Sequence, residues 1–279
     1  MKKIISYIFS FILAILIIII CFFTILKSTV MSKEYVISKL ESANYFERIN
    51  EEIIEQFKNY TIQSGLTDSV LENLFTPEKL EKDIKNVINS IYTGEKLEID
   101  TSEIKENLKE NILSEVEKEG KTVDFQDESI KEYLSAIENA YESQVSYSTS
   151  TVNSIGNTFS KILKIFDKVD TVLYIIAIVL ALVIVILNIK DIIGVKYIST
   201  SLMASGIFIL LTKILVETNM NLQNIMIINQ ASTNVIQLVI KDILGKVLTL
   251  GFTLSIVGVI SCLIYNIILK NILGEGKNK

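Results

Sequence analysis

Hydrophobic residues gather in four long runs along the chain, and one extended polar stretch separates the first run from the other three. The runs cover residues 4–26, 171–189, 197–216 and 247–269. A helix of roughly 20 residues, rising about 1.5 Å per residue, crosses the apolar core of a bilayer, which is about 30 Å thick. The pattern therefore predicts an all-α membrane protein with four transmembrane helices.

The first run, 4–26, follows two lysines near the amino terminus. A cleaved signal peptide is the alternative interpretation, but its apolar core usually spans only about 7–15 residues and ends at a small-x-small cleavage site. Residues 27–32 contain no convincing site of that kind. The run is therefore predicted to be an uncleaved signal anchor and the first transmembrane helix.

Within the polar stretch, apolar residues recur every three or four positions, which is the period of amphipathic helices. One start signal is especially clear, because Thr76, Pro77 and Glu78 supply a capping hydroxyl, a first-turn proline and an early acid. Each helix must bury one face, so residues 27–147 are predicted to form a helical-bundle domain. The helices are expected over residues 32–60, 68–75, 77–93, 102–120 and 127–147.

Residues 148–170 connect this domain to the second predicted span. Small polar residues dominate residues 146–158, around the single glycine Gly156, and this composition predicts a flexible Ser/Thr-rich linker. A continuing polar helix is the alternative. The rest of the segment alternates apolar residues with lysines and fits the headgroup region of a membrane.

Charge is segregated between the polar stretch and the hydrophobic runs. Residues 27–170 hold 17 basic and 28 acidic side chains, a net charge of −11, against −5 for the whole chain. An acidic domain is a poor nucleic-acid binder, because affinity there comes largely from neutralising phosphates. The abundance of Ile, Lys, Glu and Asn is common in proteins from AT-rich bacterial genomes.

The residue types exclude several kinds of site. The chain contains no histidine, and its two cysteines, Cys21 and Cys262, lie inside hydrophobic runs. Disulfides in the polar stretch, zinc, haem and iron-sulfur ligation, and Cys-His or Ser-His-Asp catalysis are therefore not expected. No cofactor is predicted, since the chain also lacks a Gly-rich phosphate loop and an EF-hand pattern.

Short loops decide the predicted orientation, because long domains cross a membrane regardless of their charge. Lysines are concentrated in three short segments, namely 1–3, 190–196 and 270–279. These segments are predicted to be cytoplasmic, which places residues 27–170 and the loop 217–246 outside the cell membrane. Three lysines near that loop oppose this orientation: Lys213, Lys241 and Lys246.

Lys213 and Glu217 are the charged residues of the predicted spans that are the strongest candidates for a functional role. They stand four residues apart, on one helix face. A lysine at the bilayer centre costs about 2.5–3.5 kcal/mol to insert, and such residues often mark ion paths. Lys213 lies near the end of its span, where its stem can extend to the interface. An interfacial ion pair is favoured over a transport role.

Small residues form ridges on two of the predicted spans. They are Gly251, Ser255, Gly258 and Cys262 on the fourth span, and Ser201, Ser205 and Thr212 on the third. Small side chains let membrane helices approach closely, so these spans are predicted to pack together or against a partner span, including that of a second copy. A substrate path lined by the hydroxyls is the alternative.

The residue types favour a non-enzymatic interaction or scaffold protein, which presents residues 27–147 to an envelope protein or wall component. One alternative is a transporter or transporter subunit that uses the third and fourth spans. The least favoured alternative is a carboxylate-based hydrolase acting outside the cell, because it needs a cleft and a raised carboxyl pKa, whereas solvated helix faces explain the many acids. No motif is specific enough to indicate a family.

Overall fold

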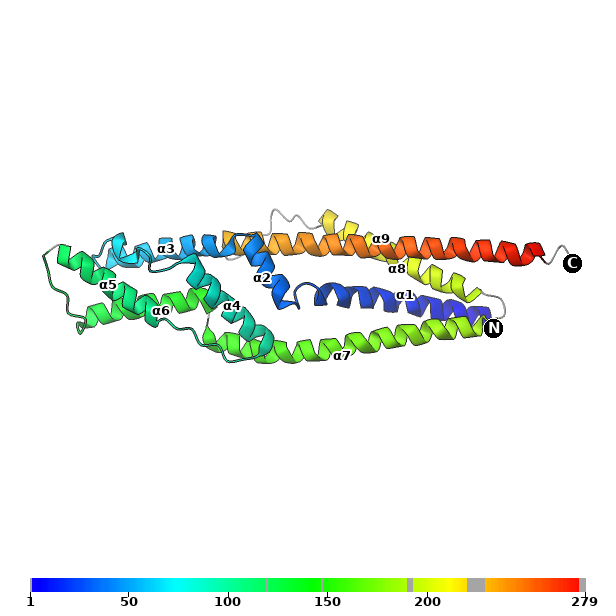
Figure 1. Ribbon diagram of the computed structural model, residues 1–279, viewed down its shortest axis with the longest axis horizontal. Helices are drawn as coiled ribbons and strands as arrows, with labels where there is room; N and C mark the ends of the chain where they lie inside the picture. Colours follow the sequence, from blue (N-terminus) through cyan, green and yellow to red (C-terminus); the bar gives the residue numbers. More distant parts are fainter. Residues whose placement is uncertain (1, 119, 147, 190–192, 220–228, 276–279) are drawn as a thin grey trace. The chain divides into compact units, whose positions relative to one another are not determined.

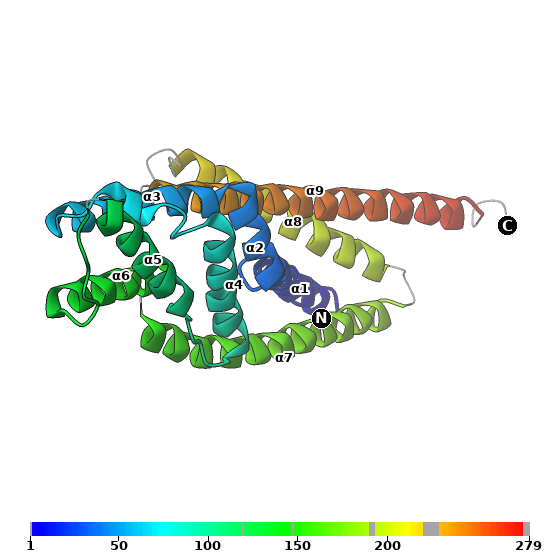
Figure 2. The same ribbon diagram turned by 60° about the vertical axis from the view of Figure 1, so that its left-hand side comes forward.

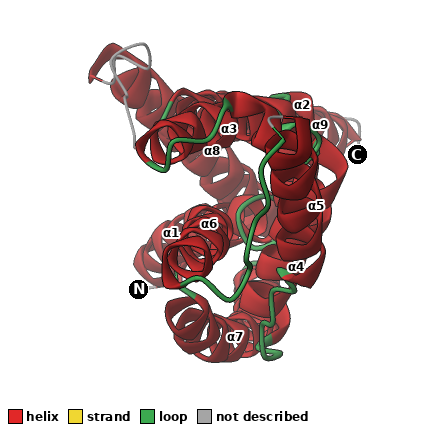
Figure 3. Ribbon diagram, turned by 90° about the vertical axis from the view of Figure 1, so that its left-hand side faces the viewer, coloured by secondary structure: helices red, strands yellow, loops and turns green. Residues whose placement is uncertain are grey.

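The computed structural model of the protein describes residues 2–118, 120–146, 148–189, 193–219 and 229–275, and these residues contain helices and loops but no strand (Figure 3). The chain divides into two compact units. The membrane unit comprises Met1–Ser32, Ile165–Ile227 and Ile236–Lys279. The bundle unit comprises Lys33–Lys164 and Ile228–Val235.

The bundle unit is built from short helices that follow one another along the chain (Figure 1). They are α2 (Lys33–Ser42), α3 (Tyr45–Gln63), the 3-10 helix η1 (Asp68–Leu71), α4 (Pro77–Thr93), α5 (Ser102–Lys118), α6 (Glu128–Ser146) and the first part of α7 (Thr149–Leu187). The start of α4 is as predicted, because the Thr76 hydroxyl accepts a hydrogen bond from the backbone N–H of Lys79 at 3.2 Å. Gly94 ends this helix in the left-handed conformation, with φ of 77°.

The prediction of one helix over residues 32–60 is wrong. The chain turns between α2 and α3 at Asn44, whose φ of 50° is left-handed. Asparagine tolerates this conformation better than most residues. The turn escaped the periodicity because the buried residues Leu40, Ala43, Phe46 and Ile49 keep a step of three across it.

The helix predicted over residues 68–75 is also shorter than expected, since η1 ends at Leu71. Thr67 does not cap it, because its hydroxyl pairs instead with the hydroxyl of Ser69 at 2.8 Å.

Aromatic rings lie at the centre of the bundle unit. The Phe75 ring lies 4.9 Å from that of Phe57 and is stacked on that of Tyr141 at 5.4 Å, measured between centroids. All three side chains are buried. Around them α3 contacts η1, α4 and α6, and α5 contacts η1 and α6. Figure 2 shows α3, α4, α5 and α6 gathered in this unit. Each fully buried aliphatic or Phe side chain contributes about 1.5–3 kcal/mol, so this core accounts for much of the stability of the unit.

The half-buried phenol of Tyr92 and the buried phenol of Tyr141 make the stability of the bundle unit sensitive to alkaline pH. Burial and the charge of Glu34 raise the pKa of Tyr92 to about 12, and burial and the Asp83 carboxylate raise the pKa of Tyr141. An unfolded tyrosine loses its proton near pH 10. Above that pH the folded state holds more protons than the unfolded state, so the free energy of unfolding decreases from about pH 10 to 12 and is unaffected by these groups below it.

Tyr92→Phe should therefore lose less stability than the wild type between pH 9 and 11.5, as measured by denaturant unfolding of the full-length protein followed by circular dichroism. Tyr60→Phe, at an exposed position, is the matched control and should follow the wild type. Parallel curves for the wild type and Tyr92→Phe would contradict the assignment.

The predicted linker is helical instead of flexible. From Thr149 onward, α7 runs through this segment without a break and continues into the membrane unit. Gly156 is explained by close packing, because a Cβ atom at this position would lie 2.5 Å from the carbonyl oxygen of Ser90 in α4. A glycine required for helix contact has the same sequence signature as a glycine in a hinge.

The membrane unit contains α1 (Lys2–Lys27), the remainder of α7, α8 (Ile193–Asn219) and most of α9 (Gln230–Glu275). These four helices are long and apolar enough to cross a membrane, as the sequence predicts. Large apolar side chains are exposed along them, including Ile178 and Leu182 on α7 and Phe252 and Ile256 on α9. Such faces are typical of helices surrounded by lipid.

Several predicted segment boundaries shift in this unit. The second part of the loop predicted over residues 217–246 is helix, because α9 begins at Gln230. The tail predicted over 270–279 is helical up to Glu275. Residues 190–192 of the predicted turn, 220–228 of the loop and 276–279 of the tail lie outside the described residues.

Candidate functional site

The membrane unit brings Lys213 and Glu217 together as an ion pair within α8. The Lys213 ammonium lies 2.5 Å from a carboxylate oxygen of Glu217, and the two side chains are 15% and 44% exposed. A lysine whose charge is already paired on its own helix is neutralised locally and needs no second helix to hold it. The two residues therefore form an ion pair within one helix, and its place at the membrane interface stays a prediction.

Lys213→Leu should leave the amount and the thermal stability of the protein close to those of the wild type, because an i,i+4 ion pair contributes only about 0.3–0.5 kcal/mol. The measurement is heat denaturation of the protein purified in detergent, with Lys213→Arg as the charge-conserving control. A phenotype or solute flux lost in the leucine variant and kept in the arginine variant would contradict this prediction and favour transport.

The small residues of α9 lie directly against α8. A Cβ atom at Gly258 would lie 2.7 Å from the backbone nitrogen of Met203 and 3.0 Å from the carbonyl oxygen of Ser199. A Cβ atom at Gly251 would meet the side chain of Leu210 at 2.9 Å. Ser255 faces Gly206 in the same contact, and Cys262 is half-buried further along the helix. Glycine is therefore needed where these two helices cross.

Ser201, in contrast, faces α1 and not α9. The Ser201 hydroxyl donates to the carbonyl oxygen of Ser10 at 2.7 Å, and the Ser10 hydroxyl donates to the carbonyl oxygen of Tyr197 at 2.9 Å. Ser205 is fully buried, and its hydroxyl bonds within α8 to Leu202 at 2.9 Å. The sequence did not show that α8 carries small residues on two faces, each of which meets a different helix.

Sequence reasoning missed a polar contact between α1 and the turn that follows α7. The Asn188 amide donates to the Ser6 hydroxyl at 2.8 Å and to the carbonyl oxygen of Ile184 at 2.8 Å, and both polar side chains are buried. The available signal was the presence of Ser6, Ser10 and Asn188 inside otherwise apolar runs, since polar side chains there tend to bond across helices. These hydrogen bonds join two segments of the membrane unit through their polar side chains.

The bundle unit contains a second polar cluster around Asp83. The Tyr141 hydroxyl donates to one Asp83 carboxylate oxygen at 2.8 Å, and the Lys79 ammonium lies 3.1 Å from the same oxygen. Lys79 also donates to the carbonyl oxygen of Asp100 at 3.0 Å. The Asp83 side chain is only 6% exposed, so the cluster is enclosed and fixes the packing of α4 on α6.

The bundle unit also has a cavity of about 450 Å³, at the end where α3 finishes and α6 begins. Leu66, Ile112, Val116, Val123 and Ile130 line it with apolar atoms, and Ser64, Ser129 and Tyr133 add hydroxyls. Binding sites for small molecules have volumes of about 300–1,000 Å³ and predominantly apolar walls.

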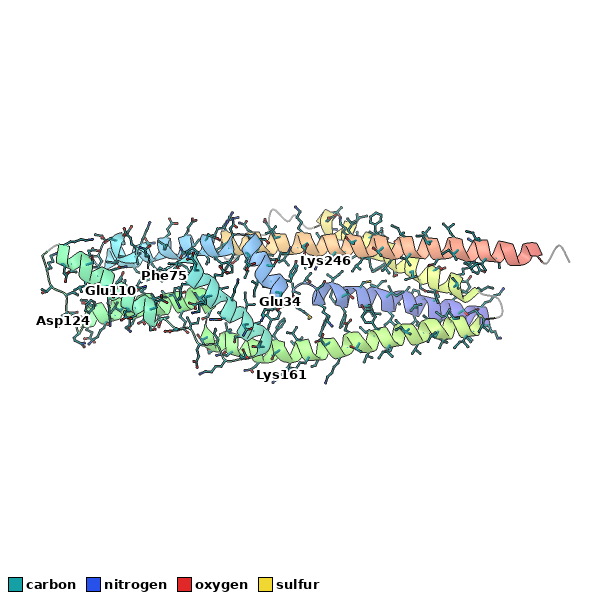
Figure 4. All side chains as sticks on the ribbon, in the orientation of Figure 1. Glu34, Phe75, Glu110, Asp124, Lys161 and Lys246 are labelled. Carbon is teal, nitrogen blue, oxygen red and sulfur yellow. The ribbon has the colours of Figure 1, made fainter. Side chains whose placement is uncertain are left out.

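The cavity lies away from the points where the chain leaves the bundle unit. Asp124, which follows the lining residue Val123, lies at the opposite end of this unit from Glu34 and Lys161 (Figure 4). The segments that form it are distant in sequence, which explains why the apolar pattern alone did not reveal it.

Acidic residues beside the cavity are held in their charged form. Although burial opposes the effect, hydrogen bonds from Ser69 and from Thr67 hold the pKa of Glu115 below its usual value. The two Glu115 oxygens accept from the Thr67 N–H at 2.8 Å and from the Ser69 hydroxyl at 2.7 Å. These hydrogen bonds to Glu115 hold η1 against α5 next to the cavity.

The described residues contain no group of three His, Cys, Asp or Glu side chains that would hold a metal ion. Two features of the structure remain as candidates for function: the closely packed membrane helices and the apolar cavity of the bundle unit. No protein-family model matches the chain, and no curated protein and no solved structure matches it.

Proposed function

We propose that this protein is a non-enzymatic binding protein of the cell membrane, which presents its bundle unit outside the cytoplasm to another component of the envelope. The observation that carries the proposal is the cavity of about 450 Å³, whose size and apolar walls are those of a ligand site. The four membrane helices serve as the anchor, and their exposed apolar faces offer contacts to lipid or to a second copy.

The orientation is supported by the distribution of lysine among the short segments. Lys2, Lys3 and Lys196 are on the side that the positive-inside rule assigns to the cytoplasm, together with the lysines of the carboxyl-terminal tail. The bundle unit follows the first membrane helix and precedes the second, so one crossing places it on the other side.

Three carboxyl groups of the bundle unit are poor candidates for a general acid. A general acid for glycoside or ester cleavage needs a raised pKa. The opposite direction is found for Asp100 and Asp127, where hydrogen bonds from Ser102 and Ser129 respectively lower the pKa of the carboxyl group. The pKa of Glu98 is lowered by its pairing with Lys96. These acids stabilise helix starts and surface pairs.

The binding proposal is tested by photo-crosslinking in intact cells. A photo-reactive amino acid at Val123, inside the cavity wall, should trap a defined envelope component, whereas the same residue at Lys161, at the other end of the bundle unit, should not. Val116→Phe, which fills the cavity, should abolish the adduct at Val123. The proposal fails if Val123 and Lys161 yield the same adducts or if the filled variant is unaffected.

The orientation is tested by cysteine labelling, since both native cysteines lie in membrane helices. An impermeant maleimide applied to intact cells should label Ser114→Cys, an exposed position of the bundle unit, but label Lys196→Cys only after lysis. The reverse pattern would place the bundle unit in the cytoplasm.

A further inference from the structure

We infer that the cavity of the bundle unit binds a ligand that combines an apolar group with a cationic hydrogen-bond donor, such as an ammonium or a guanidinium. The inference rests on the proposed function, because it names the ligand class for the same cavity. It follows from three properties of the site: the apolar walls, the hydroxyl groups and backbone N–H groups of the lining, and the charge at the rim.

The walls select an apolar body. Leu66, Ile112, Val116, Val123 and Ile130 come from four separate segments and surround the space with aliphatic carbon. Covering such a surface removes apolar area from water at about 25 cal/mol per Å², which is the main favourable term available here. A volume of about 450 Å³ accommodates a phenyl ring or a branched aliphatic side chain with its attached atoms.

Two hydroxyl groups of the lining already act as hydrogen-bond donors to the protein. The Ser64 hydroxyl donates to the carbonyl oxygen of Thr61 at 2.7 Å, and the Ser129 hydroxyl donates to the Asp127 carboxylate. The Tyr133 phenol pairs with the Thr61 hydroxyl at 3.0 Å, and either group can be the donor in this bond. Each hydroxyl has one proton, so Ser64 and Ser129 offer a ligand their lone pairs.

Four backbone N–H groups at the cavity are committed as well. Those of Gly65 and Leu66 bond to carbonyl oxygens of α3, at 3.2 and 3.3 Å. The N–H of Thr67 is taken by Glu115 at 2.8 Å, and that of Ser129 by Asp127 at 2.9 Å. A carboxylate or phosphate needs donors of this kind, whereas an ammonium needs acceptors. These groups therefore offer a ligand acceptors, which suit a donor better than an anion.

The charged residues around the opening of the cavity also favour a cationic ligand. Residues 115–132, which supply four of the lining residues between Val116 and Ile130, carry seven acidic and three basic side chains. Lys118, Lys121 and Lys131 oppose the acids but do not balance them. Exposed carboxylates at Glu117, Asp124 and Glu128 produce a negative potential that attracts a cation to the opening.

The test uses the full-length protein in an uncharged detergent and three probes that share one phenethyl group: phenethylammonium, 3-phenylpropanoate and the neutral 2-phenylethanol. Titration calorimetry should show that phenethylammonium binds at least about tenfold more tightly than 3-phenylpropanoate, with the alcohol between them. A second arm compares the capped peptides Gly-Lys-Phe-Lys-Gly and Gly-Glu-Phe-Glu-Gly. Tighter binding of the lysine peptide than of free phenethylammonium identifies a protein segment as the source of the group, and the reverse identifies a free amine.

Cavity-filling variants distinguish binding of the probe in the cavity from its partitioning into the detergent micelle. Val116→Phe should weaken phenethylammonium binding at least about tenfold, and Ile130→Phe provides a second, independent change if the first disturbs folding. Lys161→Ala is the control and should bind like the wild type.

Equal affinities for the ammonium and the carboxylate, or binding that survives both filled variants, would overturn the inference. Failure of the inference and failure of the proposed function are distinguishable. If the crosslinker at Val123 still captures an envelope component specifically while the charge preference is absent, the ligand class is wrong and the binding function stands. If capture and probe binding both fail, both proposals are wrong.

Discussion

Asp83→Ala should destabilise the bundle unit by about 3 kcal/mol, the lower end of the range for breaking a buried ion pair. The change removes the acceptor of the fully buried Tyr141 hydroxyl and the counterion of Lys79, whose side chain is 15% exposed. Lys79 keeps its bond to the carbonyl oxygen of Asp100, which limits the loss. Hydrogen exchange of the full-length protein, read by mass spectrometry, should show reduced protection in α4 and α6.

Three further variants separate the causes of this effect. Asp83→Asn keeps an oxygen for Tyr141 and should lose less stability than alanine does. The double variant Lys79→Met with Asp83→Leu removes both charges and should recover much of the loss, because an apolar pair replaces a buried ion pair at little cost. Glu98→Ala breaks a pair in which both side chains are 77% exposed and should have no measurable effect. A double variant as unstable as Asp83→Ala would show that the lost acceptor of Tyr141 or the packing, and not the charge of Lys79, causes the effect.

Gly206→Ala should destabilise the membrane unit by about 1–3 kcal/mol, which is the usual cost of overpacking. The new Cβ atom would lie 2.6 Å from the backbone nitrogen of Ser255 and 2.8 Å from the carbonyl oxygen of Gly251. Backbone atoms cannot rotate away, so α8 and α9 would have to separate. The full-length protein in detergent should show a lowered Tm, by roughly 2–4 °C per kcal/mol.

Gly245→Ala is the matched control, because this glycine lies in α9 and a Cβ atom there would meet nothing within 4 Å. Alanine favours the helix over glycine by about 0.8–1.0 kcal/mol, so this variant should be neutral or more stable than the wild type. The same substitution is thus expected to act with opposite signs at two positions. Equal shifts in Tm at Gly206 and Gly245 would refute close packing between α8 and α9.

The sequence by itself determined the features that depend on a few neighbouring residues. Four apolar runs predicted four helices long enough to cross a membrane, because the bilayer sets that length. The period of apolar residues predicted the amphipathic helices of residues 77–93 and 102–120 nearly to their ends, since Thr76, Gly94 and Gly120 act locally on the backbone. The classes of chemistry that need histidine or exposed cysteine were excluded by composition alone.

Only the tertiary structure decided the features that join distant residues. Periodicity could not separate Asn44 in a turn from Asn44 in a helix, because the apolar step continued across it. Gly156 and Ser201 were classified by residue type, but their roles depend on Ser90 and on Ser10, far away in the chain.

The cavity illustrates the same limit for the candidate site. It forms where Leu66, Val116 and Ile130 meet, and an amphipathic pattern shows that each side is buried without showing that the sides leave a space between them. The length of an apolar run, the period of apolar residues and the helix caps are local properties of a chain. A cavity and a helix contact depend on the packing of segments that are distant in sequence and that only folding brings together.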